Sequence, residues 1–139
     1  MSWSRVSILA LAFGFSGGLA LAQQPAPADD WKMISEEDGY TLWAGKPKPA
    51  DAQLSVDILF KYEQPRLHLD QWFYKSVRQN FQFDCKANTY RVISLEMFTD
   101  EWGTSEVLYR RKFSYEPLDI AEGSRAAAYS KAVCDSGSK

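Results

Sequence analysis

The sequence predicts an α+β fold, a mostly antiparallel meander sheet of about six strands with one C-terminal helix packed on it, stapled by a disulfide. Three observations predict it. Runs of alternating apolar and polar residues are separated by turn-forming residues, as in consecutive antiparallel strands. One alanine-rich run, residues 125–134, follows a serine that can cap a helix. The chain has two cysteines, Cys85 and Cys134, and the second ends the predicted helix.

Residues 1–22 have the features of a signal peptide. Arg5 precedes a short apolar stretch, and Ala20-Leu21-Ala22 provides a small-x-small cleavage sequence. An uncleaved membrane anchor is the alternative interpretation. Glycine and serine at positions 14 and 16–18 interrupt the stretch, whereas a spanning helix needs about 20 mostly apolar residues. We therefore predict cleavage after Ala22 and export, with no cysteine following to accept a lipid anchor.

The mature chain is predicted to hold one domain. Residues 23–30, QQPAPADD, form a flexible Pro/Ala-rich leader, the domain spans 31–134, and 135–139 are a disordered tail. Cleavage removes one basic residue and leaves 15 basic against 18 acidic residues, a balance of −3. This mild charge predicts no nucleic acid partner, and it gives no attraction to an anionic membrane. We expect no membrane insertion after signal cleavage.

The N-terminal half of the domain shows a hairpin and one long strand. WKMI (31–34) and YTLWA (40–44) are strands around a turn at Asp38-Gly39. Residues 45–53 contain two prolines, which remove ladder donors, so they are predicted to be a loop. Residues 54–62 form the clearest strand. Its inward face comprises Leu54, Val56, Ile58, Phe60 and Tyr62.

The next segments form a second hairpin. Residues 63–76 break the alternation and are predicted to be a long connection. Strands follow at 77–85 and 90–99 around the turn KANT. If Cys85 pairs with Tyr90, the inward residues of the return strand are Tyr90, Val92, Ser94 and Phe98, whereas hydrophobicity favours Ile93, Leu95 and Met97. A bulge or a five-residue turn would reconcile the two patterns.

The C-terminal part gives the last strand, at 106–113, and the helix. After an irregular loop, Ser124 caps a helix of about ten residues, which is too short to be stable alone in water. Packing on the sheet and a tether at Cys134 must hold it. Two distant cysteines in an exported chain predict a disulfide rather than a metal site or a redox pair. A disulfide between them would close a loop of about 50 residues and stabilise the fold by ~4 kcal/mol.

The sequence shows no catalytic arrangement, and we predict no metal and no cofactor. His68 is the single histidine, two residues before Asp70, and a loop histidine alone does not make a triad. Two bridged cysteines leave too few ligands for zinc. The acidic run 36–38 lacks the alternate spacing of a calcium loop, and no glycine-rich phosphate loop is present.

The candidate protein-binding residues lie in the segment without alternation. Trp72, Phe73 and Tyr74 are consecutive, so they cannot all point to one side. Together with nearby cations they form an aromatic-cationic cluster of the kind enriched at protein interfaces. The cations are Arg66, Lys75 and Arg78. The alternative is that this segment covers an open edge or end of the sheet.

A set of short motifs spans residues 31–134. They are Trp31, Tyr62, Lys75-Ser76, Phe83-Asp84-Cys85, Tyr90-Arg91, Ser94-Leu95, Gly123-Ser124 and Val133-Cys134. Their order resembles the surface-adhesin protein E family, small exported proteins of Gram-negative bacteria. The resemblance implies an antiparallel sheet with a helix held by a cysteine pair. It also implies binding to host matrix or serum proteins such as vitronectin and laminin.

The predicted function is therefore that of an exported, non-enzymatic binding domain with a protein ligand, either a host protein or an envelope partner. It would reside in the periplasm or at the cell surface. The alternative is a small periplasmic enzyme or enzyme inhibitor with a site near His68, Asp70 and the loop 72–74. An uncovered last strand would also allow two copies to pair edge to edge as a homodimer.

Overall fold

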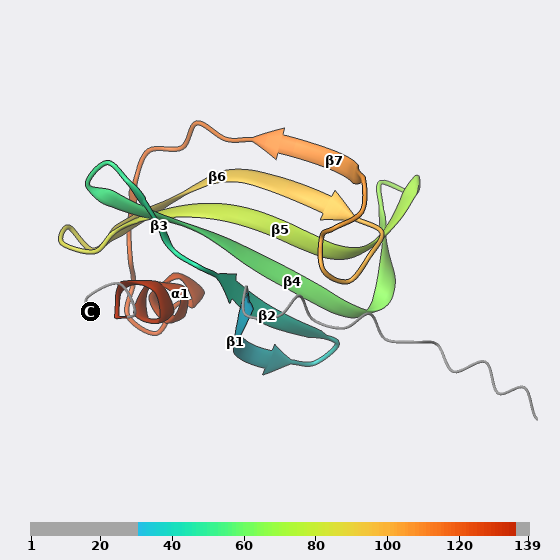
Figure 1. Ribbon diagram of the computed structural model, residues 1–139, viewed down its shortest axis with the longest axis horizontal. Coiled ribbons are helices and arrows are strands. Elements are labelled where there is room, and N and C mark those ends of the chain that lie inside the picture. The colour runs from blue at the N-terminus through green and yellow to red at the C-terminus, as the bar shows by residue number, and fades with distance from the viewer. Residues whose placement is uncertain (1–30, 136–139) are drawn as a thin grey trace, which may run out of the picture.

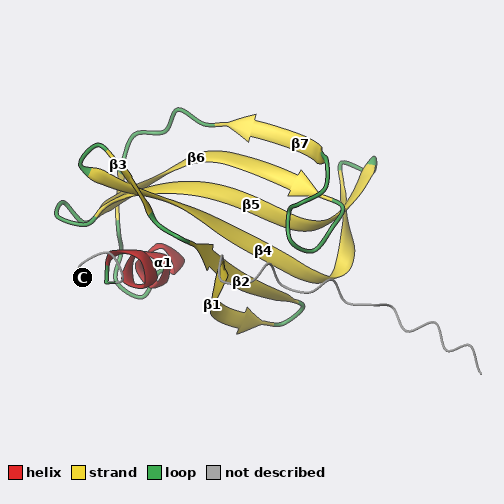
Figure 2. Ribbon diagram, viewed as in Figure 1, coloured by secondary structure: helices red, strands yellow, loops and turns green. Residues whose placement is uncertain are grey.

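The computed structural model describes residues 31–135, in which eight strands form an open sheet and one helix follows them (Figures 1 and 2). The elements are β1 (Trp31–Glu37), β2 (Tyr40–Gly45), β3 (Lys48–Ala50), β4 (Gln53–His68), β5 (Trp72–Asp84), β6 (Thr89–Phe98), β7 (Val107–Lys112), β8 (Leu118–Asp119) and α1 (Arg125–Cys134). The predicted signal peptide and leader at 1–30, and residues 136–139 of the predicted tail, lie outside the described residues. Asp135 is described, and it is the C-cap of α1.

The sheet follows chain order, as a meander should. Six strands run β1-β2-β4-β5-β6-β7, each antiparallel to its neighbour, which confirms the predicted α+β fold. Two short strands lie off this path: β3 pairs with the start of β4, and β8 with the start of β6. The prediction of a loop over 45–53 was therefore wrong at β3. Pro49 is tolerated there because β3 pairs with one strand alone and needs no donor on its outer side.

The main core lies between α1 and one face of the sheet. Alternate residues of β4 and β5 point to this face, and Val56, Ile58 and Phe83 are at most 1% exposed. From the helix, Tyr129 and Val133 complete the cluster, and the Tyr129 ring meets Phe81 edge-on with 5.4 Å between centroids. Each such buried side chain contributes roughly 1.5–3 kcal/mol. The helix begins as predicted, because the Ser124 side chain accepts a hydrogen bond from the backbone of Ala127.

The opposite face of the sheet has a smaller apolar cluster at its other end. Leu59, Phe98 and Trp102 are at most 3% exposed, and Trp102 meets Trp43 edge-on with 5.0 Å between centroids. Trp102 belongs to the loop 99–106, which joins β6 to β7 and folds onto this face (Figure 1). The sheet therefore has apolar cover on both faces, α1 on one and this loop on the other.

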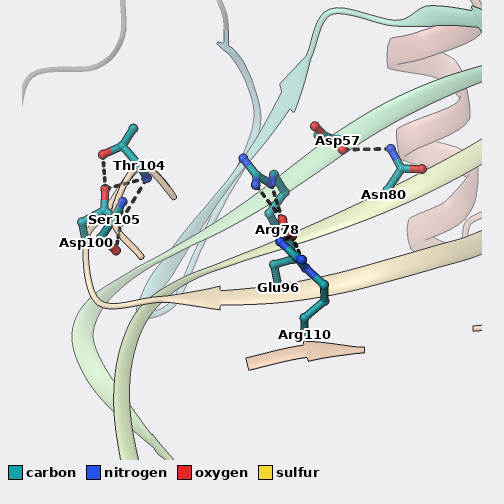
Figure 3. A network of polar contacts seen from close by, with 8 residues as sticks. All are labelled: Asp57, Arg78, Asn80, Glu96, Asp100, Thr104, Ser105 and Arg110. Atoms are coloured by element: carbon teal, nitrogen blue, oxygen red, sulfur yellow. Dashed lines mark hydrogen bonds and ion pairs between the residues drawn. The ribbon is translucent and has the colours of Figure 1, made fainter. Parts of the chain in front are cut away.

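Asp100 organises that loop through its carboxylate. The carboxylate accepts hydrogen bonds from the backbone and hydroxyl groups of Thr104 and Ser105, at 2.6–3.1 Å (Figure 3). It also accepts one from the backbone N–H of Trp102 at 3.2 Å. Ser76 of β5 is fully buried and donates to the Asp100 carbonyl at 2.7 Å. Asp100 therefore holds the loop through both its carboxylate and its backbone carbonyl.

A substitution at Gly103 can test how tightly this loop packs. Its φ is +65°, and a Cβ there would lie 3.2 Å from the Phe98 ring. We expect Gly103→Ala to lower the free energy of unfolding, measured by urea denaturation, by about 1–2 kcal/mol. Alanine is disfavoured in the left-handed backbone, and its Cβ would crowd the Phe98 ring. Gly123→Ala is the control, because its φ is +76° but nothing lies within 4 Å of the added Cβ. Equal losses in the two variants would contradict the packing contribution.

A bulge sets the register between β5 and β6, and it is one of the two solutions that the sequence predicted. Phe83 pairs with Tyr90 and Phe81 with Val92, but Asn80 then pairs with Ser94, so Ile93 is the extra residue. Before the bulge, Tyr90 and Val92 share the face of the main core. After it, Leu95 and Met97 take that face. Each inward set that the sequence suggested is therefore used in part, one on each side of the bulge, whereas Ser94 and Phe98 face the opposite side of the sheet.

The predicted disulfide is present. Cys85 and Cys134 are bonded, with 5.9 Å between their Cα atoms, and join the turn after β5 to the last residue of α1. The bond lies at the end of the sheet where α1 is located (Figure 1). It supplies the tether that a helix of ten residues needs.

Candidate binding surface

Residues 63–76, predicted to be a long connection, instead extend β4 and β5 into a long hairpin. Lys61 pairs with Ser76, and the next pair is Arg66 with Tyr74, so four residues of β4 oppose one of β5. Such a bulge twists and bends the strands. Alternation fails in the sequence at this point because the register shifts. We call residues 66–74 beyond the bulge the hairpin tip, which lies at the opposite end of the sheet from α1 (Figure 1).

The bend brings the hairpin tip over the neighbouring strands. β5 and β6 separate β4 from β7 in the sheet, yet the His68 ring lies 4.9 Å from that of Tyr109 on β7. His68 also stacks on Trp72, with 5.9 Å between centroids and 17° between planes, and meets Tyr74 edge-on. These contacts fix one side of the hairpin tip against the sheet.

A second group of rings extends this contact toward the body of the sheet. Tyr74 meets Tyr62 edge-on at 5.7 Å, and the Arg66 guanidinium lies 4.6 Å above the Tyr62 ring. Burial raises the pKa of the Tyr62 hydroxyl above its ordinary value, with the neighbouring Tyr74 adding to the effect. Tyr62 is therefore a neutral, packed ring at physiological pH, and Arg66 and Tyr74 serve to hold the hairpin tip in place.

The other side of the hairpin tip is apolar and faces solvent. Leu67 pairs with Phe73, and because side chains alternate along a strand, both point away from the His68–Trp72 stack. Leu67 is 47% exposed, Phe73 64% and the turn residue Leu69 69%. We call these three residues the tip apolar surface. Trp72, on the opposite side of the hairpin, is 36% exposed.

The turn that carries Leu69 has an unusual backbone. Leu69 and Asp70 have φ of +49° and +52°, and the N–H of Gln71 donates to the carbonyl of His68 at 3.0 Å. Both central residues of this β-turn have the positive φ that glycine and asparagine normally adopt in hairpin turns. A leucine in the left-handed region costs about 1–2 kcal/mol. The strain places a large apolar side chain at the outermost point of the hairpin.

Two of the predicted binding cations are used elsewhere. Lys75 donates to Glu101 at 2.6 Å, and its hydrogen bond lowers the pKa of the Glu101 carboxyl. Arg78 pairs with Glu96, which Arg110 also contacts (Figure 3). Burial would raise the pKa of Glu96, but the hydrogen bonds from the two arginines outweigh it and lower the pKa. Lys75 and Arg78 therefore lie in structural ion pairs.

His68 and Asp70, proposed for an alternative enzyme or inhibitor site, do not form a catalytic pair. The Nε2 atom of His68 is buried without a hydrogen-bond partner, and Asp70 is exposed in the turn. An oriented general base needs a hydrogen-bonded acid on its second nitrogen, which this geometry does not supply. Within residues 31–135, no group of three or more His, Cys, Asp or Glu is placed to hold a metal ion.

The structure thus divides the predicted cluster and enlarges it. Trp72, Phe73, Tyr74 and Arg66 meet at the hairpin tip. The sequence interpretation missed Leu67, Leu69 and Tyr109. The alternating leucines of RLHLD carried a strand signal for the first two, but Tyr109 is brought there by the bend alone.

The family comparison now adds to this geometry. The family described as surface-adhesin protein E matches residues 31–135, which is most of the chain. The chain belongs to the surface-adhesin protein E family. This adhesin E domain matches no curated protein and no solved structure significantly.

Membership confirms the resemblance seen in the motifs and indicates a surface-adhesin-like binding protein. It also indicates a surface or secreted location. In the described part of this adhesin E domain, no helix is long and apolar enough to cross a membrane.

Proposed function

We propose that this adhesin E domain is an exported, non-enzymatic protein that binds a protein ligand through the tip apolar surface. The observation that carries the proposal is Leu69, a strained leucine that is 69% exposed. Backbone strain of this kind is retained where it serves a function more often than elsewhere. Folding gains nothing from an exposed leucine in a turn that glycine would suit.

The neighbouring residues supply what a protein interface requires. Leu67 and Phe73 add exposed apolar area on one strand pair. Trp72 and Arg66, residue types enriched at binding hot spots, are also exposed, but on the opposite side of the hairpin. The packed inner side of the hairpin tip holds these residues in one conformation before binding. A preorganised surface loses less conformational entropy on association. The ligand is a host matrix or serum protein or a partner in the cell envelope, met at the cell surface or in the periplasm.

The first test is Phe73→Ser, measured by biolayer interferometry of the exported protein against vitronectin, laminin, serum and periplasmic extract. We expect saturable binding at micromolar concentration, weakened at least tenfold by the substitution, because a central aromatic side chain typically contributes more than 1 kcal/mol. Leu118→Ser is the matched control, since Leu118 is also an exposed apolar residue, at 55%, but lies on β8. The absence of any saturable ligand would refute the proposal.

Leu69→Gly separates binding from folding. Glycine adopts the left-handed backbone without strain, so the variant should be as stable as the wild type or more stable by up to about 1 kcal/mol. Its affinity for the same ligand should nevertheless fall at least tenfold, because the apolar side chain is lost. Unchanged affinity would place the binding site away from the hairpin tip.

A further inference from the structure

The first strand of the sheet has an open edge beside the helix. β1 begins the strand order and pairs with β2 alone among the described strands. A groove of about 690 Å³ runs between it and α1. Its walls are Lys32–Ile34 from β1, Ala128, Lys131 and Ala132 from α1, and the C-cap residue Asp135. Helix α1, which forms one of these walls, lies at the opposite end of the sheet from the hairpin tip (Figure 1).

The two walls suit an extended chain. An edge strand presents backbone N–H and C=O groups that a further strand can bind. β1 is seven residues long, contains no proline and carries the exposed side chain of Met33, 47% accessible. On the helix side, Ala128 and Ala132 are short and leave room for the side chains of an added strand. An edge strand flanked by a helix is the geometry by which β-strand addition recognises peptides.

The charges along the groove favour one orientation of a bound strand. Lys32 and Lys131 are both exposed and line the same part of the groove, with Asp135 the one acidic residue beside them. At the other end of β1, Glu36 and Glu37 are exposed. An added strand antiparallel to β1 would place its C-terminal half near the two lysines and its N-terminal half near the two glutamates. Opposite charges across such an interface fix register and orientation.

We propose that the groove between β1 and α1 binds an extended peptide as an antiparallel strand. The peptide has alternating apolar side chains, acidic residues in its C-terminal half and a basic residue at its N-terminal end. This site is separate from the tip apolar surface, and either can fail without the other. It gives the domain a second contact, with an unstructured segment of a partner protein.

The test is an NMR titration of the ¹⁵N-labelled mature protein with the probe acetyl-Lys-Thr-Val-Thr-Val-Thr-Val-Asp-Asp-amide. We expect chemical-shift changes and slowed amide exchange in residues 32–35 and 128–132, with saturation below millimolar concentration. Changes at β7 or at the hairpin tip, or no saturation, would overturn the proposal. Concentration-dependent shifts in β1 without peptide would instead identify a second copy of the chain as the occupant.

Charge exchange makes the test specific. The double variant Lys32→Glu/Lys131→Glu should bind the probe at least tenfold more weakly. It should regain affinity for a probe in which the two aspartates are lysines, because opposite charges are restored. Lys112→Glu, the same change on exposed β7 at the far edge of the sheet, should leave both affinities unchanged. Equal binding of the two probes by wild type and double variant would overturn the proposed orientation.

Ala132→Arg provides a variant that keeps the helix and fills the groove. Arginine has nearly the helix propensity of alanine, so the melting temperature should change little. Both probes should lose binding because the added side chain occupies the space of the new strand. Retained binding in this folded variant would mean that the peptide lies elsewhere.

Discussion

Removing the disulfide, in the double variant Cys85→Ala/Cys134→Ala, is expected to lower the free energy of unfolding by about 4 kcal/mol. The two cysteines are 49 positions apart, so their bond closes a long loop and restricts the unfolded chain strongly. Against a total of roughly 5–15 kcal/mol for a typical domain, this is a major share. The melting temperature should fall by well over ten degrees, about 4–8 °C per kcal/mol for a small domain.

The loss should also be uneven across the molecule. α1 is ten residues long and is joined to the sheet by the buried side chains of Ala126, Tyr129 and Val133 and by the bond at Cys134. Without the bond, amide exchange in α1 should accelerate more than in β4–β6. Reduction of the wild type with dithiothreitol is the control and should reproduce the variant. Equal protection of α1 in the reduced and oxidised proteins would contradict the role of the tether.

The sequence allowed most of the sheet to be predicted because burial and alternation coincide there. Residues 54–62 show a period of two, and the structure buries the predicted face of that strand against α1. The helix followed from Ser124 and the alanines, and the bulge from a conflict between two inward sets. Each of these features depends on residues that are close together in the chain.

The hairpin tip could not be predicted in the same way. Its strands extend beyond the core, so no buried face selects an apolar pattern, and the bulge before Arg66 shifts the period. Composition identified Trp72–Tyr74 as candidates, but the exposure of Leu69 depends on a positive φ that composition does not encode. The partners of Lys75 and Arg78 lie 26 and 18 residues away and are set by sheet register and loop folding.

A second large effect is expected at Asp100, on the opposite face of the sheet. Partial burial alone would raise the pKa of this carboxyl, but the hydrogen bonds from Thr104 and Ser105 outweigh it and hold the pKa well below its ordinary range. Asp100→Asn removes the charge and turns an amide N–H toward groups that also donate. At neutral pH we expect a loss of about 2–3 kcal/mol in urea denaturation, allowing for solvent screening at this partly exposed site.

The lowered pKa of Asp100 also predicts how the stability difference between the variant and the wild type changes with pH. Because the pKa of Asp100 is lower in the folded than in the unfolded chain, its stabilisation is complete above about pH 5 and declines as the pH falls through the unfolded-state value toward the folded one. The Asn variant should therefore lose less stability than the wild type between neutral pH and pH 3. Some slope should remain, since the pKa values of Glu96 and Glu101 are also lowered.

Glu106→Gln is the matched control for that measurement, because it removes an exposed carboxylate from the same loop. It should leave both the stability at neutral pH and the acid slope close to wild type. If Asp100→Asn and wild type lose stability in parallel on acidification, the ionised carboxylate does not hold the loop. Other contacts of the loop, among them the Trp102 ring against Trp43 and the hydrogen bond from Ser76 to the Asp100 carbonyl, would then be sufficient to hold it. A parallel loss would also predict that Gly103→Ala, which disturbs the packing of the loop on Phe98, costs more than Asp100→Asn at every pH.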